Sequence, residues 1–349
     1  MSDFHALKIA AVDKLTPNAV ALSFEIPANL TETFSFTAGQ YITLKHTING
    51  EEVRRAYSIS SAPSSNQLTV GIKKVPNGTF SVFANENLGS GDVLEVMPPE
   101  GRFIFENTSE PQNIAAFAAG SGITPILSIA QSVLESNPNN TFVLVFGNQS
   151  PEETMYYGAL EDLVNKYSDR FFIQYMFSRA QAENALFGRI ESSTVNFVVK
   201  NKYKETDFDK YYLCGPEEMI QTVSDTLTNN GVSAEKVLFE LFTASNTKDE
   251  MADALDGQTQ VEVLVDDETF SFAMDQKSLV LDAVLKEKID APYSCQGGVC
   301  SSCIARITEG KAEMVKNQIL TDGEVADGLI LTCQAHPTTP TLKIDYDDV

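Results

Sequence analysis

The stretch "YSCQGGVCSSC", from Tyr293 to Cys303, holds three of the five cysteines of the chain within nine residues. A fourth follows after 29 intervening residues in "ILTCQAHP". Disulfides, a zinc site and an iron–sulfur cluster are the competing explanations. An odd number of cysteines cannot be fully paired, and zinc sites more often use two short C-x2-C pairs, of which this stretch has one. The C-x4-C-x2-C…C spacing is the plant-type [2Fe–2S] spacing, with two glycines that let the loop approach the sulfides. The predicted cluster ligands are Cys295, Cys300, Cys303 and Cys333.

Length and composition limit the class of protein. The 349 residues predict two or three domains, and 48 acidic against 25 basic residues give a net charge of −23. That charge argues against nucleic acid or an anionic membrane as the main partner, although it is equally typical of a soluble acidic protein. The longest nearly uncharged stretch, "NIAAFAAGSGITPILSIAQSVL", contains Gly, Ser, Thr, Pro and Gln at its centre, so we expect no membrane insertion. With no signal peptide pattern, a cytoplasmic location is expected.

The chain is predicted to have three domains of different fold class. Residues 1–108 show short alternating strands separated by turns, which predicts an antiparallel β-barrel. Residues 109–243 alternate strands and helices, which is the pattern of a parallel α/β sheet. A polar, acidic segment at 244–258 is predicted to be a linker, and 259–349 is expected to form a small α+β unit with the cysteine loop.

The cysteine motifs resemble the C-terminal ferredoxin domain of oxygenase reductases, which has a β-grasp fold. Motifs upstream extend this resemblance over essentially the whole chain, in the order flavin domain, nicotinamide domain, ferredoxin domain. The superfamily is that of ferredoxin–NADP reductases, and within it the chain is similar to the family of reductase components of phenylacetyl-CoA epoxidase. The relatives of that family serve steroid, alkane and fatty-acyl oxygenases.

Two motifs in the first domain resemble the flavin signatures of this superfamily. "RRAYSIS" matches its RxYS/T motif, so the resemblance implies that Arg55 pairs with the FAD pyrophosphate, Tyr57 packs on the isoalloxazine ring and Ser58 bonds near N5. "NGTFS" opens a predicted helix whose N-terminal amides suit a phosphate. The candidates there are Gly78, Thr79, Phe80 and Ser81. Taken alone, the first motif is better explained by a surface arginine and a half-buried tyrosine on a barrel strand, and FMN is used by reductases of another domain order.

The second domain carries three motifs that resemble nicotinamide-binding elements. "AAGSGITPI" joins a strand to a helix predicted to begin near Pro125, and its glycine turn suits a pyrophosphate. The resemblance implies that this loop binds through Gly120, Ser121, Gly122 and Thr124. It also implies that Cys214 and Gly215 lie beside the nicotinamide. At the end of the domain it implies roles for Glu240 and Phe242, and the Phe242 ring would cover the flavin. A glycine-rich βα turn, a buried core cysteine and a core-strand phenylalanine are the alternative interpretations.

Ser178, Arg179 and Arg189 bear on the choice of nucleotide. "FSRAQ" ends the third strand of the domain, and its Ser-Arg pair resembles that of NADP-using reductases, with Arg189 as a second cation. NADPH is therefore the predicted donor, although some NADH enzymes of this group also carry arginine here.

These motifs together predict a reductase. A flavin can accept two electrons from a hydride and release them singly to a one-electron cluster. We predict that electrons pass from NADPH through FAD and the [2Fe–2S] cluster to a separate oxygenase, epoxidase or desaturase. A nucleotide-binding redox sensor or electron carrier is the alternative. Residues 258–349 hold 16 acidic and 7 basic residues, so a salt-sensitive complex with a basic acceptor is expected, with candidate contacts at Asp266, Asp267, Glu268 and Asp290.

Overall fold

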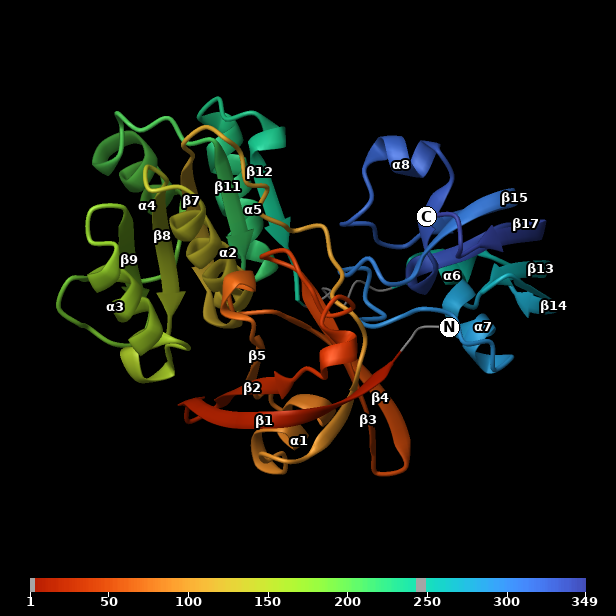
Figure 1. Cartoon of the computed structure of the whole chain (residues 1–349). Helices are drawn as coiled ribbons and strands as arrows, with labels where there is room; N and C mark the ends of the chain where they lie inside the picture. Colours follow the sequence, from red (N-terminus) through yellow and green to blue (C-terminus); the bar gives the residue numbers. More distant parts are fainter. Residues whose placement is uncertain (1–3, 243–248) are drawn as a thin grey trace. The chain divides into compact units, whose positions relative to one another are not determined.

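The computed structural model describes residues 4–242 and 249–349 (Figure 1). The described residues form two compact units. The N-terminal unit comprises His5–Val53 and Tyr57–Phe242, and the C-terminal unit comprises the residues from Asp249 onward together with Phe4 and Arg54–Ala56. No described helix is long and apolar enough to cross a membrane.

The first part of the N-terminal unit is an antiparallel sheet, as the barrel prediction required. Its strand order is β4-β3-β6-β1-β2-β5. The strands are β1 (His5–Thr16), β2 (Ala19–Glu25), β3 (Tyr41–Ile48), β4 (Glu51–Ser58), β5 (Leu68–Lys73) and β6 (Val93–Val96), and one helix, α1 (Thr79–Glu86), follows β5. Alternate residues of these strands point into a core that includes Leu7, Ile9, Leu22 and Val70. Helix α1 closes the core with Phe80, which is buried.

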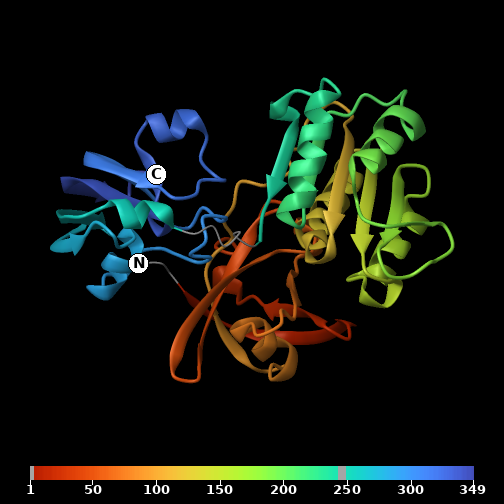
Figure 2. The same cartoon turned by 180° about the vertical axis from the view of Figure 1, so that it is seen from behind.

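The second part of the N-terminal unit is a parallel sheet in the order β10-β9-β8-β7-β11-β12. Its strands are β7 (Asn113–Ala119), β8 (Thr141–Asn148), β9 (Phe171–Phe177), β10 (Ala185–Phe187), β11 (Lys210–Cys214) and β12 (Val237–Glu240). Its helices are α2 (Ile123–Ser136), α3 (Tyr157–Lys166), α4 (Ser192–Asn196) and α5 (Glu217–Asn229). Helices α2 and α3 cover one face of the sheet, and α4 and α5 cover the other (Figures 1 and 2). Strands covered on both faces must be apolar throughout, which explains the run "NIAAFAA" in β7.

This sheet has a topological switch point between β7 and β11. The chain leaves β7 towards β8 on one side and later returns to β11 on the other, so the loops after β7 and β11 diverge. In open α/β sheets, ligands bind at the carboxyl ends of the strands beside such a point. Short helical turns complete the described structure: η1 (Ala28–Leu30), η2 (Pro63–Ser65), η3 (Gly120–Gly122), η4 (Pro151–Glu153), η5 (Phe197–Lys202), η6 (Ala234–Lys236) and η7 (Thr332–Gln334).

The C-terminal unit is a mixed sheet in the order β14-β13-β17-β15-β16. Its elements are α6 (Glu250–Ala254), β13 (Gln258–Val265), β14 (Glu268–Asp275), α7 (Val280–Lys286), β15 (Ile304–Met314), α8 (Asp322–Ala326), β16 (Leu329–Leu331) and β17 (Ala335–Asp345). The first and last strands, β13 and β17, pair in parallel at the centre, and the other pairs are antiparallel. Helix α7 packs on this sheet through Val280, Leu281 and Val284, so the predicted α+β unit is confirmed.

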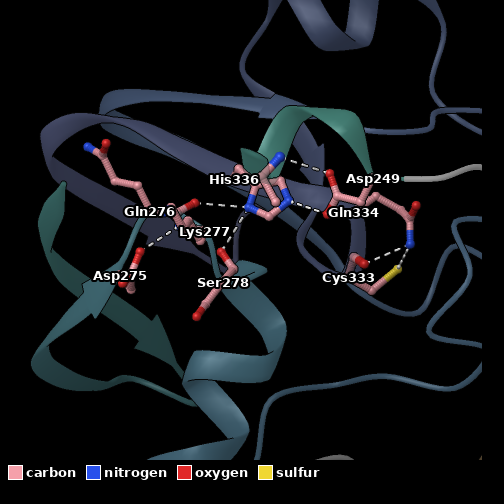
Figure 3. Close-up of polar contacts among 9 residues, drawn as sticks. Asp249, Asp275, Gln276, Lys277, Ser278, Cys333, Gln334 and His336 are labelled. Atoms are coloured by element: carbon pink, nitrogen blue, oxygen red, sulfur yellow. Dashed lines mark hydrogen bonds and ion pairs between the residues drawn. The ribbon is translucent and has the colours of Figure 1, made fainter. Parts of the chain in front are cut away.

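Two boundaries differ from the sequence-based expectation. Helix α2 begins at Ile123 rather than near Pro125, because the turn η3 leads directly into it. Part of the predicted linker 244–258 lies outside the described residues, and the rest contains α6 and the first residue of β13. Helix α6 was not expected from the sequence; its N-cap, Asp249, is local, but the bond from Asp249 to His336 joins residues far apart in the chain (Figure 3).

Candidate functional site

The glycine loop after β7 meets the loop after β11 at the switch point. A Cβ on Gly122 would lie 2.0 Å from the carbonyl oxygen of Cys214, so only glycine allows this approach. A Cβ on Gly215 would lie 3.2 Å from the backbone nitrogen of Ala119, which is also a tight contact. Gly120 has a φ of +57°, in the left-handed region. The two predicted nucleotide motifs, residues 120–124 and 214–215, therefore lie side by side at the carboxyl end of the sheet, and together they are called the floor.

The N-terminus of α2 adjoins this floor, although the Ile123 N–H is bonded to the carbonyls of Gly120 and Ser121 and Pro125 has no N–H. No side chain caps the helix, and the first four N–H groups of a helix have no partner within it. Thr124 is buried and donates its hydroxyl to the carbonyl of Ser121 at 3.0 Å, which fixes the turn. What favours a phosphate group here is therefore the dipole of a 14-residue helix.

Three predicted residues, Ser58, Cys214 and Glu240, come together beside this floor. Cys214 and Glu240 are register partners on the parallel strands β11 and β12. Ser58, which is buried at the end of β4, donates its hydroxyl to Oε2 of Glu240 at 2.8 Å. This hydrogen bond joins Ser58 of the antiparallel sheet to Glu240 of the parallel sheet.

Burial controls the protonation of this cluster. Desolvation raises the pKa of Glu240 to about 8, although the hydrogen bond from Ser58 opposes the shift. Glu240 is therefore mostly protonated at pH 7 and can hold a proton inside the site. Desolvation, and next the nearby Glu240 carboxyl, raise the pKa of the fully buried Cys214 thiol, which stays neutral.

The predicted flavin residues lie on β4 and at the start of α1. Tyr57 is half-buried with its ring centroid 5.7 Å from that of Phe80, which is itself a core residue. Arg55 is exposed, and its guanidinium donates to the carbonyl of Arg54 at 2.6 Å. The exposed Arg55 guanidinium therefore does not pack in the barrel core, which is what a ligand-binding side chain requires.

The loop before α1 forms a small cradle. A Cβ on Gly78 would lie 2.5 Å from Oγ of Ser81 and 3.1 Å from the carbonyl oxygen of Val75. Ser81 is buried, and its hydroxyl accepts from the Val75 N–H at 3.1 Å. Helix α1 has no side-chain cap, so the amides of Thr79 and the residues after it point out of an open helix end. This geometry fits a phosphate of FAD.

Ser178, Arg179 and Arg189 are at one edge of the parallel sheet. Phe177 on β9 and Phe187 on β10 are register partners, so the two arginines each follow the paired residues by two positions. Both arginines are exposed. The backbone N–H and the hydroxyl of Ser178 both donate to the carbonyl of Asn148, at 3.0 and 3.3 Å, which ties the end of β9 to the end of β8.

The sequence motifs missed two residues at this end of the molecule. Lys73, the last residue of β5, has its Nζ 3.7 Å from the point where a Cβ on Gly120 would lie, so an ammonium group faces the glycine loop. Asn148, at the carboxyl end of β8, has both side-chain amide atoms buried without a hydrogen-bond partner among the described residues. A lysine at a strand end and a lone asparagine carry no recognisable signal in one sequence.

Phe242 follows β12 and has an exposed fraction of 38%. An exposed aromatic ring two residues after Glu240 is consistent with a ring that covers a ligand. No bond or ring contact of Phe242 fixes its orientation in the described structure, so its predicted role stays a prediction.

The four clustered cysteines of the C-terminal unit lie together, and all are free thiols. Cys300, Cys303 and Cys333 are buried, and hydrogen bonds join Cys295 to Cys300, Cys295 to Cys333 and Cys303 to Cys333. Thiol hydrogen bonds from Cys300 and Cys333 lower the pKa of Cys295, and the same contacts raise the pKa of Cys300 and of Cys333. A thiolate is the form that binds metal.

The surroundings of the sulfurs suit a two-iron cluster. The Gly297 N–H donates to Sγ of Cys295 at 3.3 Å, and Gln334 Nε2 lies 3.8 Å from Sγ of Cys333. N–H donors of this kind tune iron–sulfur clusters. No group of three or more His, Cys, Asp or Glu side chains is arranged for a metal ion within residues 4–242 and 249–349. The sulfur contacts show that the four cysteines lie together, and it is their spacing that favours a [2Fe–2S] cluster over a single zinc ion.

Comparison with known families assigns all three parts of the chain. Residues 6–105 match the oxidoreductase FAD-binding domain, residues 117–225 the oxidoreductase NAD-binding domain, and residues 263–338 the 2Fe-2S iron-sulfur cluster binding domain. The predicted FAD, nicotinamide nucleotide and [2Fe–2S] cofactors are thereby confirmed.

Curated relatives match over nearly the full length. The chain is 35% identical to one of the subunits of the 1,2-phenylacetyl-CoA epoxidase of Escherichia coli K12, with 99% of each chain covered. It is 30% identical to the ferredoxin reductase component of 3-ketosteroid-9-alpha-monooxygenase of Rhodococcus rhodochrous, with 97% of this chain and 96% of that one covered. It is 29% identical to the glycine betaine monooxygenase reductase subunit of Pseudomonas aeruginosa, covering 90% and 88%.

Solved structures show the same fold. Phthalate dioxygenase reductase matches with a TM-score of 0.62 at 23% identity and 98% coverage of both chains. An intact type IV self-sufficient cytochrome P450 monooxygenase matches with a TM-score of 0.72 at 17% identity, over 98% of this chain and 41% of that one. With its FAD-binding, NAD-binding and 2Fe-2S domains in one chain, the protein is an oxidoreductase that belongs to the family of reductase components of oxygenase systems.

Proposed function

We propose that this reductase takes electrons from NADPH and delivers them, through FAD and the [2Fe–2S] cluster, to a separate phenylacetyl-CoA epoxidase or a similar oxygenase. The observation that carries the proposal is the cluster of Ser58, Cys214 and Glu240 at the switch point, where the flavin part and the nucleotide part meet. Bound FAD would supply the exchange of a two-electron hydride for single electrons.

The residues of the chain have distinct tasks in this function. Arg55 and the open end of α1 bind the FAD pyrophosphate, while Tyr57 packs against the flavin ring and Phe242 covers it. Gly120, Gly122 and the end of α2 hold the nucleotide pyrophosphate, with Lys73 adding a positive charge beside the loop. Glu240, whose raised pKa favours its protonated form at pH 7, accepts the Ser58 hydroxyl at Oε2, and the neutral Cys214 thiol fills the floor without a repelling charge.

The preference for NADPH rests on the two exposed arginines. Arg179 and Arg189 follow paired positions on adjacent strands, so their guanidinium groups are within reach of one phosphate, and Ser178 lies beside them. We expect the ratio of kcat/KM for NADPH to that for NADH to fall at least tenfold in Arg179→Ala, since an arginine–phosphate pair is lost. An unchanged ratio would refute this assignment.

The acceptor is proposed to dock through charge. Residues 258–349 carry a net charge of −9, and Asp266 and Asp267 form the turn between β13 and β14, where both backbone N–H groups donate to Asp347. A basic surface on the acceptor would be steered to this unit, and the attraction would weaken with salt. Transfer to the cognate acceptor should slow with rising ionic strength while flavin reduction by NADPH does not.

Anaerobic reduction tests the function as a whole. NADPH should bleach the flavin and then give the signal of a reduced [2Fe–2S] cluster, with cytochrome c as a convenient external acceptor. Rapid steady-state reduction of cytochrome c would exclude a redox sensor that binds nucleotide without turnover. Bleached flavin with a cluster that stays oxidised would refute the proposed path.

The domain boundaries and the cellular location are also proposals. The family matches at 6–105, 117–225 and 263–338 fall within the proposed domains 1–108, 109–243 and 259–349. Five free thiols are typical of a reducing compartment, which supports a cytoplasmic location. Cell fractionation tests the location directly.

A further inference from the structure

Tyr156, the residue directly before α3, has a backbone conformation that is rare for a bulky side chain. Its φ is +59°, in the left-handed region, where a non-glycine residue is strained. Its side chain does not cap α3; its hydroxyl instead lies 2.7 Å from Oγ of Ser60. Strain of this kind persists only where the surrounding structure holds it, and the bond to Ser60 is one contact that does so.

The hydroxyl of Ser60 connects this contact to the antiparallel sheet. Ser60 is buried, follows Ser58 of the flavin motif by two residues, and donates its hydroxyl to the carbonyl of Thr69 on β5 at 3.1 Å. Since one hydroxyl has one proton to donate, the Tyr156 hydroxyl is the donor in its bond to Ser60. Desolvation raises the pKa of Tyr156, so the phenol keeps this proton. The two hydroxyls therefore form a directed chain of hydrogen bonds from Tyr156 to β5.

The nucleotide loop lies against the same strand, β5. A Cβ on Gly71 would lie 2.8 Å from Cγ2 of Thr124 and 2.8 Å from the hydroxyl oxygen of Tyr156. Gly71 therefore allows an approach that a side chain would obstruct, and Thr124 and Tyr156 meet β5 at this one residue. Lys73, two residues further along β5, is the residue whose ammonium group faces Gly120. Strand β5 thus supports both the hydroxyl chain and the loop that is predicted to bind the nucleotide.

Helix α2 is bonded to the same segment of the antiparallel sheet. The hydroxyl of Ser128, which is fully buried, donates to the carbonyl of Ser61 at 2.7 Å. The side-chain amide of Gln131 donates to the carbonyl of Ser60 at 3.2 Å. Because Ser60 follows Ser58 by two residues, the segment 58–61 connects the flavin motif to the helix that begins at the nucleotide loop. Tyr156 adds the third hydrogen bond to this segment, from outside α2.

We propose that Tyr156 is a positioning residue for hydride transfer, and that its hydroxyl fixes the distance between Ser58 of the flavin motif and the nucleotide loop. The inference rests on the proposed function, in which one hydride, two electrons with a proton, passes from NADPH to FAD and leaves NADP+. A displacement of about 1 Å at a reacting site costs about 100-fold in rate. Loss of one buried hydrogen bond, with Ser128 and Gln131 still in place, is a smaller change, and we expect about a fivefold loss.

The test compares wild type with four variants of the full-length protein loaded with FAD and cluster. Tyr156→Phe removes the hydroxyl and keeps the ring, Ser60→Ala removes the partner of that hydroxyl, and the double variant removes both. Tyr157→Phe removes the hydroxyl of the exposed neighbouring tyrosine and is the matched control. Anaerobic stopped-flow at several NADPH concentrations separates the limiting rate of flavin reduction from the Kd of NADPH. The long-wavelength absorbance of a nicotinamide stacked on the flavin, measured with NADP+ added to the dithionite-reduced protein, reports their geometry without turnover.

We expect Tyr156→Phe to lower the limiting rate about fivefold and to weaken the long-wavelength absorbance. The Kd of NADPH should stay within twofold of wild type, and the FAD content should be unchanged. Ser60→Ala should show a similar loss, and the double variant should lose no more than either single variant, because both changes remove the same bond. Tyr157→Phe should match wild type.

Four results would overturn the proposal. They are a limiting rate in Tyr156→Phe within twofold of wild type, an equal loss in Tyr157→Phe, a loss in the double variant equal to the product of the two single losses, and a Tyr156→Phe protein that loses FAD or is impaired only in NADPH binding. If NADPH reduces no flavin even in wild type, the proposed function itself fails, and the wild-type trace shows this separately from any effect of Tyr156.

Discussion

Replacing Gly122 by alanine should disable nucleotide-dependent flavin reduction while leaving the fold in place. The added Cβ would lie 2.0 Å from the carbonyl oxygen of Cys214, and real Cβ atoms essentially never approach closer than 3.0 Å. The two loops at the switch point must therefore separate by about 1 Å. Overpacking of this kind costs about 1–3 kcal/mol of stability, and a displacement of about 1 Å at a reacting site costs about 100-fold in rate.

Anaerobic stopped-flow bleaching of the flavin by saturating NADPH measures this loss. Gly158→Ala on α3 is the matched control, because a Cβ there meets nothing within 4 Å and alanine is the better helix former. FAD and iron content should stay at wild-type levels in both variants. Flavin reduction in Gly122→Ala within twofold of wild type would refute the proposed close contact of the two loops.

Three further predictions concern single side chains. Because the folded-state pKa of Glu240 is raised to about 8, its stabilising neutral form is fully present below its ordinary value of 4.5 and is lost as pH rises through 8. The free energy of unfolding of wild type should therefore fall relative to Glu240→Gln between pH 5 and 8, by at most about 1.4 kcal/mol per pH unit; a constant difference across that range would contradict a neutral carboxyl at this half-buried position. Lys73→Ala should raise KM for NADPH about tenfold through loss of a charged contact, while Lys74→Ala, which only breaks a surface pair with Glu86, should not; equal effects would assign Lys73 to general surface charge. Arg55→Ala should weaken FAD binding at least about tenfold with an unchanged melting temperature of the apoprotein, and wild-type affinity would make Arg55 an ordinary surface residue.

The sequence predicted best where one local motif determines the structure. The spacing from Cys295 to Cys303 specified a cluster loop, and the strand–glycine–helix pattern around Gly120 specified the nucleotide floor. Glycine at Gly122 was expected to form a turn. Only glycine fits at position 122 because the carbonyl of Cys214, 92 residues away, leaves no room for a side chain. The parallel pairing of β7 with β11 brings that carbonyl close.

The features that the sequence did not show all depend on distant partners. Lys73 faces the glycine loop only because the barrel strand β5 ends beside it, and a lysine at a strand end matches no motif. Helix α6 lies in a polar segment without periodicity, and its cap, Asp249, is held by His336 from 87 residues away. The domain boundaries, the individual site residues and the preference for NADPH stay predictions until they are measured.

The order of electron flow is the central claim, and a cluster-free variant tests it most directly. Cys300→Ser removes one ligand from the loop before β15, whereas Ser58, Cys214 and Glu240 belong to the N-terminal unit. Wild type should contain one FAD and two iron atoms per chain, and Cys300→Ser should keep FAD and lose the iron. With NADPH, the variant should bleach its flavin at the wild-type rate yet fail to support turnover of the cognate oxygenase. Oxygenase turnover at the wild-type rate in Cys300→Ser, or one zinc and no iron in wild type, would contradict the account.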